Sequence, residues 1–151
     1  MSRSVEVRDA RPEEFDALRG LFRRSSLSVE GSRQALLAHP AALELPVRTD
    51  GVRSRVAVDG DGRILGFATG VPDGEHVELD DLFVEPDVQR GGIGRVLIED
   101  IAAGARAVGN ARLEVTANPD AEPFYAKAGF VAVGEVTTEL GPGIRMVLDL
   151  A

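Results

Sequence analysis

Three consecutive segments in the middle of the chain alternate between apolar and polar residues, and a turn signal follows each of the first two. Alternation with a period of two is typical of strands that bury one face. The turn signals are Asp59-Gly60-Asp61-Gly62 and Pro72-Asp73-Gly74, and such short connections join antiparallel neighbours. A nucleotide-binding fold of alternating strands and helices is therefore disfavoured. The segments predicted to form an antiparallel meander are Arg53–Val58, Arg63–Val71 and His76–Val84.

Helical periodicity occurs on both sides of this meander. Before it, Pro12 suits the first turn of an amphipathic helix that runs to Phe22, and a short helix is expected at Arg33–Ala38. After it, an apolar stripe predicts a long helix, which the pair Gly109-Asn110 closes at its C-terminus. The stripe consists of Ile93, Leu97, Ile101, Ala105 and Val108.

The remaining segments complete a three-layer α/β (α+β) domain with a mixed central sheet. The chain has 151 residues and no convincing linker, so one domain is expected across residues 1–151. A bulge is expected at Gly134, because the apolar phase shifts there. The predicted elements are a strand at Val5–Arg8, a strand at Arg112–Thr116, a helix at Ala121–Ala128, a strand at Val131–Leu140, a turn at Gly141-Pro142-Gly143 and a last strand at Ile144–Leu150.

Composition excludes several classes of function. The chain contains 0 Cys and 2 His, so disulfide scaffolds, thiolate zinc sites and cysteine nucleophiles are ruled out and no metal site is expected. A net charge of −8 and an aromatic content of 5% disfavour nucleic acid as a partner. No apolar run approaches the roughly 20 residues of a membrane helix, and Met1–Arg11 lacks the apolar region of a secretory signal. A cytoplasmic protein with no membrane partner is expected.

A glycine cluster joins the third meander strand to the long helix; it reads Gln89-Arg90-Gly91-Gly92-Ile93-Gly94-Arg95. Glycines let a ligand approach the backbone closely, and the amides of a helix N-terminus attract anions. The cluster has the chemistry of a diphosphate cradle, although a turn that only lets the helix pack on the strand would use the same glycines. It is no Walker A loop, and Leu97 stands where a dinucleotide fingerprint requires its third glycine.

Together with two further blocks, this cluster resembles the GNAT superfamily of acyl-CoA-dependent N-acetyltransferases. Gln89, Gly92 and Gly94 match the family signature Gln/Arg-x-x-Gly-x-Gly/Ala. Upstream, Leu82-Phe83-Val84-Glu85-Pro86 resembles the family's strand before the loop. Downstream, the stretch from Asn118 through Phe124-Tyr125 to Gly129-Phe130 resembles its Asn…Phe-Tyr-x-x-x-Gly-Phe segment. The predicted order of elements also matches, and the resemblance implies a mostly antiparallel sheet that is splayed at the cofactor site.

The resemblance implies acetyl-CoA as co-substrate and transfer of its acetyl group to a primary amine by direct attack in a ternary complex. The pantetheine arm would pair with the main chain of Leu82, Phe83 and Val84, as an added strand does. The thiol end would meet Asn118, Phe124 and Tyr125. The diphosphate would lie on the segment after the strand, which consists of Gln89, Arg90, Gly91, Gly92, Ile93, Gly94 and Arg95.

The resemblance also suggests an acid and a base. Tyr125, the only tyrosine, would protonate the leaving thiolate, because a phenol stays protonated at neutral pH. Glu78 would take the proton of the amine, and Asp80, Asp81 and Glu114 are rivals for this role. By strand alternation Glu78 and Asp80 share a face and Asp81 points the other way, unless a bulge intervenes.

The sequence leaves the acceptor open among small-molecule and peptide amines. In the family the acceptor pocket is built mainly from variable segments, here about Phe22–Leu45 and Val136–Arg145. His76 is expected at the surface, because strand ends are exposed. A homodimer is possible. The alternative function is a non-catalytic acyl-CoA-binding sensor or interaction module of the same fold.

Overall fold

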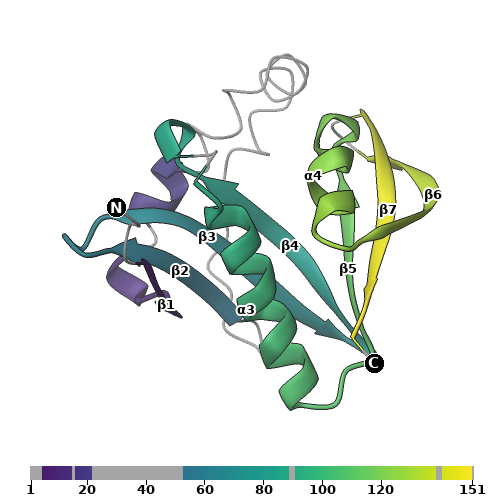
Figure 1. Ribbon diagram of the computed structural model, residues 1–151, viewed down its shortest axis with the longest axis horizontal. Coiled ribbons are helices and arrows are strands. Elements are labelled where there is room, and N and C mark those ends of the chain that lie inside the picture. The colour runs from purple at the N-terminus through teal and green to yellow at the C-terminus, as the bar shows by residue number, and fades with distance from the viewer. Residues whose placement is uncertain (1–4, 15, 22–52, 89–90, 139–140, 151) are drawn as a thin grey trace.

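The computed structural model describes residues 5–14, 16–21, 53–88, 91–138 and 141–150, and within these ranges seven strands form one sheet (Figure 1). The strand order is β1-β2-β3-β4-β5-β7-β6, and each neighbouring pair is antiparallel except β4 with β5. The predicted mixed, mostly antiparallel sheet is confirmed. The strands are β1 (Val5–Asp9), β2 (Arg53–Asp59), β3 (Ile64–Asp73), β4 (His76–Val84), β5 (Arg112–Ala117), β6 (Val131–Thr138) and β7 (Gly141–Asp149).

The central meander is confirmed, since β2, β3 and β4 pair as antiparallel neighbours in chain order. In the first turn the Asp59 carboxylate accepts hydrogen bonds from the backbone N–H groups of Asp61 and Arg63, at 2.9 and 3.0 Å. Gly62 has a φ of 84°, which glycine adopts without strain. The second turn is shorter than predicted, because Pro72-Asp73 still pairs with β4.

Helices cover both faces of the sheet and give the three predicted layers. α3 (Ile93–Ala107) lies across β2, β3 and β4 on one face, where its apolar side joins the main core (Figure 1). The other face carries a second core, to which residues 16–21 contribute as a short helix. The predicted helix at Pro12 starts differently, because Pro12–Glu14 form a 3₁₀ turn (η1). The second core consists of Leu18, Leu21, Val56, Val58 and Phe67.

Most of the apolar stripe predicted for the long helix is buried, as expected. Val108 is the exception at 76% exposure, because α3 ends at Ala107 and Val108 is its C-cap residue. The predicted closing pair is confirmed. The N–H groups of Gly109 and Asn110 donate to the carbonyls of Arg106 and Ala105, each at 3.0 Å, which is a Schellman motif. The buried residues of the stripe are Ile93, Leu97, Ile101 and Ala105.

The C-terminal part contains the predicted short helix and one error of prediction. α4 (Glu122–Lys127) follows the 3₁₀ turn η4 (Pro119–Ala121). The register of β6 against β7 shifts at Val133, which confirms a bulge next to Gly134. The turn predicted at Gly141-Pro142-Gly143 is wrong, because these residues already pair with β6. Proline has no backbone N–H to donate, and it is tolerated there because the edge of β7 that faces β5 is paired only from Ile144 onward.

Several predictions concern residues outside the described ranges. These are the helix at Arg33–Ala38, the acceptor segment Phe22–Leu45, and the cofactor residues Gln89 and Arg90. The single domain across residues 1–151 stays a prediction. Among the described helices, none has the length and apolar character needed to cross a membrane.

Candidate active site

β4 and β5 run side by side at one end and then diverge (Figure 1). Their parallel ladder joins His76–Glu78 to Arg112–Glu114 and ends there. Beyond that point β4 continues beside β3, while β5 continues beside β7. The sheet is therefore splayed between two central strands, as predicted. We call the end of the ladder, where Glu78 pairs with Glu114, the vertex of the splay.

A bulge at Asp80 decides which acidic residues of β4 share a face. Leu79 and Asp81 pair with consecutive residues of β3, which leaves Asp80 as an extra residue. One extra residue reverses the alternation of side chains along a strand. Asp81, rather than Asp80, therefore shares a face with Glu78, and the expectation that Glu78 and Asp80 point the same way is wrong.

The two faces of the sheet differ in character at the vertex. The strand neighbours of Glu78 and Glu114 belong to the main core, together with α3 and with Tyr125 of α4. Because side chains alternate along a strand, Glu78 and Glu114 point to the opposite face. The candidate acid and the candidate bases thus flank the splay from opposite sides of the sheet. The core neighbours are Val77, Leu79, Leu113 and Val115.

Arg145 of β7 holds both glutamates at the vertex. Its Nη1 and Nη2 atoms donate to Oε2 and Oε1 of Glu78, at 2.5 and 2.6 Å. Nη2 also donates to Oε1 of Glu114 at 2.9 Å, and Nη1 to the hydroxyl of Thr116 at 3.1 Å. The hydrogen bonds to Glu78 are the main reason that the pKa of Arg145 is raised above its ordinary value. The pair is a bidentate, charge-assisted contact of the stronger kind.

His76 and Arg112 complete this cluster. The Nε2 atom of His76 lies 3.2 Å from Oε1 of Glu78, and its Nδ1 atom lies 3.5 Å from Oε2 of Glu114. The His76 side chain is only 14% exposed, so the expected surface position is wrong. Burial opposes the ionisation of Glu114, but hydrogen bonds from Arg112 and Arg145 hold the pKa of Glu114 below its ordinary value.

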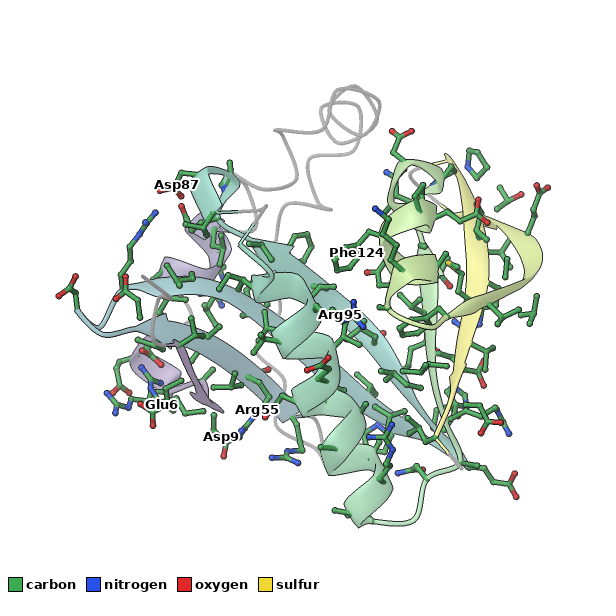
Figure 2. All side chains as sticks on the ribbon, viewed as in Figure 1. Glu6, Asp9, Arg55, Asp87, Arg95 and Phe124 are labelled. Carbon is green, nitrogen blue, oxygen red and sulfur yellow. The ribbon has the colours of Figure 1, made fainter. Side chains whose placement is uncertain are left out.

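The first turn of α3 contains the glycines of the predicted diphosphate cradle. Gly92 is the N-cap residue with a φ of 79°, and as a glycine it has no side chain with which to cap the helix. The carbonyl of Gly92 accepts from the N–H of Val96, whereas the N–H groups of a helix's first turn have no acceptor within the helix. The N–H of Gly91 already donates to the carbonyl of Val88 at 3.0 Å. The exposed Arg95 lies at the start of the same helix (Figure 2).

Phe124 of α4 lies next to this turn, and Tyr125 follows it in the same helix. A Cβ atom added to Gly94 would sit 2.9 Å from Cζ of Phe124, so glycine permits this contact between α3 and α4 (Figure 2). Phe124 is 40% exposed, whereas Tyr125 is only 7% exposed and packs edge-on against Phe124 and Phe130. Burial raises the pKa of Tyr125, so the phenol keeps its proton at neutral pH.

Asn118 follows β5 directly and begins the turn that leads to α4. Its Oδ1 atom accepts a hydrogen bond from the backbone N–H of Asp120 at 2.9 Å, which caps η4. The side chain thereby fixes how the chain leaves β5 toward Phe124 and Tyr125. This local role comes directly from the Asn-Pro-Asp sequence.

Sequence reasoning missed Arg145 as a partner of both candidate bases, and it missed His76 beside them. A weak signal for Arg145 was present, because core residues Ile144 and Met146 flank it in an alternating strand. Nothing local indicated that β7 lies next to β5 rather than at the edge of the sheet.

Comparisons with known proteins agree with this architecture. The family description "Acetyltransferase (GNAT) domain" matches residues 37–149. An uncharacterized N-acetyltransferase of Mycobacterium bovis is 34% identical over 97 residues, which cover 62% of each chain. The chain spans only 42% to 62% of the length of the curated relatives considered.

Two solved structures show the same fold over nearly the whole chain. A GCN5-related N-acetyltransferase from Rhodopseudomonas palustris has a TM-score of 0.77 and 25% identity, and covers 99% of this chain and 98% of its own. The PaiA N-acetyltransferase of Thermoplasma acidophilum, in complex with coenzyme A, has a TM-score of 0.74 and 17% identity, covering 97% and 99%. With its splayed sheet and its glycine-capped α3, the chain belongs to the GNAT family of acetyltransferases.

Proposed function

We propose that the protein moves an acetyl group from acetyl-CoA to a primary amine by direct attack in a ternary complex. One observation carries this proposal: the splay between β4 and β5 has a buried, protonated phenol on one face and two glutamates at its vertex on the other. Acyl transfer to an amine needs a proton acceptor for the amine and a proton donor for the thiolate. In this proposal Glu78 or Glu114 would be the acceptor and Tyr125 the donor.

The chain's own backbone would hold the co-substrate. The first turn of α3, from Gly92 to Arg95, would bind the diphosphate through its N–H groups and its positive helix end. Nothing lies within 4 Å of a Cβ atom added to Gly92, so the approach to this turn is open among the described residues. Gln89, Arg90 and Gly91 would extend the cradle. When bound, acetyl-CoA supplies an activated thioester.

The strand and the short helix would position the reacting end. The main chain of Leu82, Phe83 and Val84 would pair with the pantetheine arm, and one of their N–H groups would stabilise the oxyanion. Asn118 and Phe124 would line the thiol end of this path.

Two side chains would move protons. Tyr125 would donate its proton to the leaving sulfur, which its protonated state at neutral pH allows. Glu78 would accept the proton of the amine, and Glu114 is its rival, since both lie at the vertex. A lysine-like amine is only about 0.1% neutral at pH 7, so a proton acceptor is needed.

The acceptor would be a small-molecule or peptide amine. The test is release of coenzyme A thiol from acetyl-CoA across a panel that contains spermidine, an aminoglycoside, free amino acids and peptides with a free N-terminus or lysine. We expect release with at least one member. The competing function, an acyl-CoA-binding module without turnover, predicts binding by calorimetry and no release with any amine. Absence of both binding and release would reject both functions.

A further inference from the structure

We propose that Arg145 is a positioning residue of the transfer reaction: from β7 it fixes the orientation and the charge of the carboxylates that receive the acceptor's proton. This inference rests on the proposed function and names a residue that the acid and base assignments do not contain.

The geometry places one guanidinium on both candidate bases. Arg145 engages both oxygens of Glu78 and one oxygen of Glu114. The planar guanidinium matches a carboxylate in two places, so it fixes the plane of Glu78 as well as its distance. Glu78 and Glu114 are paired neighbours at the last rung of the β4–β5 ladder. Without a cation between them, their like charges would repel.

The position of Arg145 in the sheet makes this contact specific to the vertex. Arg145 pairs in register with Thr116 of β5, and its side chain reaches past β5 to Glu78 of β4. It therefore connects three strands at the point where two of them diverge. A side chain at this place can set the orientation of the Glu78 carboxylate relative to the splay. An ion pair elsewhere on the sheet could not do so.

The charges around the two glutamates come from four strands. Within the described residues, the charged or titratable side chains that contact Glu78 or Glu114 are His76 of β4, Arg112 of β5 and Arg145 of β7. Asp73 of β3 lies 3.8 Å from His76, and Asp81 of β4 shares the face of Glu78. Among the residues that the structure describes, Arg145 is the one permanent cation that contacts both carboxylates. Its removal is expected to raise the pKa of Glu114, which the hydrogen bond from Arg145 helps to hold below its ordinary value.

Two substitutions separate orientation from charge. Arg145→Met removes both, and Arg145→Lys keeps the charge but loses the planar fork. Arg55 provides the matched control. It bridges Asp9 and Asp100 at 2.7 Å each in the β1–β2–α3 part of the molecule, with a similarly buried side chain. Arg55→Lys therefore removes a comparable bidentate contact at a place away from the splay.

The first measurement needs no acceptor. Uniformly ¹³C-glutamate-labelled protein is titrated by NMR, and Glu78→Gln and Glu114→Gln variants assign the two carboxyl signals. We expect the midpoint of Glu114 to rise in Arg145→Met, to rise less in Arg145→Lys, and to stay in place in Arg55→Lys. An unchanged Glu114 midpoint in Arg145→Met would overturn the inference. Thermal denaturation confirms that each variant is folded at the temperature used, and Arg145→Lys decides the matter if Arg145→Met does not fold.

The second measurement follows the pH profile of kcat/KM with the best amine of the panel. Arg145→Met is expected to lower kcat/KM by about 10- to 100-fold at pH 7 and to move the acidic limb of the pH profile upward together with the NMR midpoint of Glu114. Arg145→Lys should return the acidic limb close to its wild-type position but should not restore kcat/KM. An unmoved acidic limb together with a moved Glu114 midpoint would overturn the role of Arg145 in the reaction. A wild-type protein that binds acetyl-CoA but releases no thiol with any amine would overturn the proposed function instead.

Discussion

The Gly92→Glu variant tests whether the first turn of α3 holds a diphosphate. Gly92 has a φ of 79°, and an added Cβ would have no atom of the described residues within 4 Å. The substitution therefore introduces backbone strain without a clash, at a cost of about 1–2 kcal/mol for a residue in the left-handed region. For a chain of this size, each kcal/mol lowers the Tm by about 2–4 °C, so we expect a loss of roughly 2–8 °C.

The affinity for acetyl-CoA is expected to fall much further than the stability. A carboxylate about 5 Å from a phosphate charge is repelled by about 3 kcal/mol at an effective dielectric constant near 20. This raises the Kd by more than about 100-fold. Gly92→Lys adds similar bulk with the opposite charge, so it should retain more affinity than Gly92→Glu and thereby separate repulsion from obstruction.

Gly109 provides the matched control at the other end of the same helix. It has a φ of 84°, and nothing lies within 4 Å of an added Cβ. Gly109→Glu therefore has the same strain, and its carboxylate meets the unfavourable negative end of the helix, so its Tm should fall at least as far. Calorimetry with acetyl-CoA should show near-wild-type affinity for Gly109→Glu. Equal affinities of Gly92→Glu and Gly109→Glu would refute the cradle.

Three further expectations concern protonation. Tyr125→Phe removes the proposed donor but keeps the ring, so kcat should fall by roughly 100-fold or more while the Kd for acetyl-CoA changes little; an unchanged kcat would remove Tyr125 from the acid role. Because the chain has 1 Tyr and burial raises its pKa, an ultraviolet titration should find the phenol still protonated at pH 10, and a midpoint at or below that pH would contradict the burial argument. The hydrogen bond from Arg8 lowers the pKa of Glu14 from 4.5 to about 2, so this pair stabilises the fold above pH 4.5 and its contribution is lost as the pH falls toward 2. In urea denaturation, the free energy of unfolding of Glu14→Gln should therefore fall less than that of the wild type between pH 4.5 and pH 2. An equal fall in both proteins would show that the pair contributes nothing.

Local patterns predicted most of the elements and the place of the glycine cluster at the start of α3. The meander, the apolar stripe of α3 and its Gly109-Asn110 closure depend on neighbours within a few residues, and the structure confirms them. Val108 and the segment Gly141-Pro142-Gly143 were mispredicted for a similar reason. Hydrophobic periodicity does not determine where a helix ends. A Gly-Pro-Gly sequence does not reveal that one edge of the strand is unpaired there, which is what allows a proline inside the strand.

The pattern of residues alone therefore determined which segments become strands and helices, because hydrophobic period and turn chemistry act over short distances. The tertiary structure decided the rest of the site. An extra residue at Asp80 turned Asp81 to the face of Glu78, and the insertion of β7 beside β5 brought Arg145 onto Glu78, 67 residues away in the chain. Register and strand order are set by packing between distant segments, so no local pattern could reveal that the two candidate bases share one guanidinium.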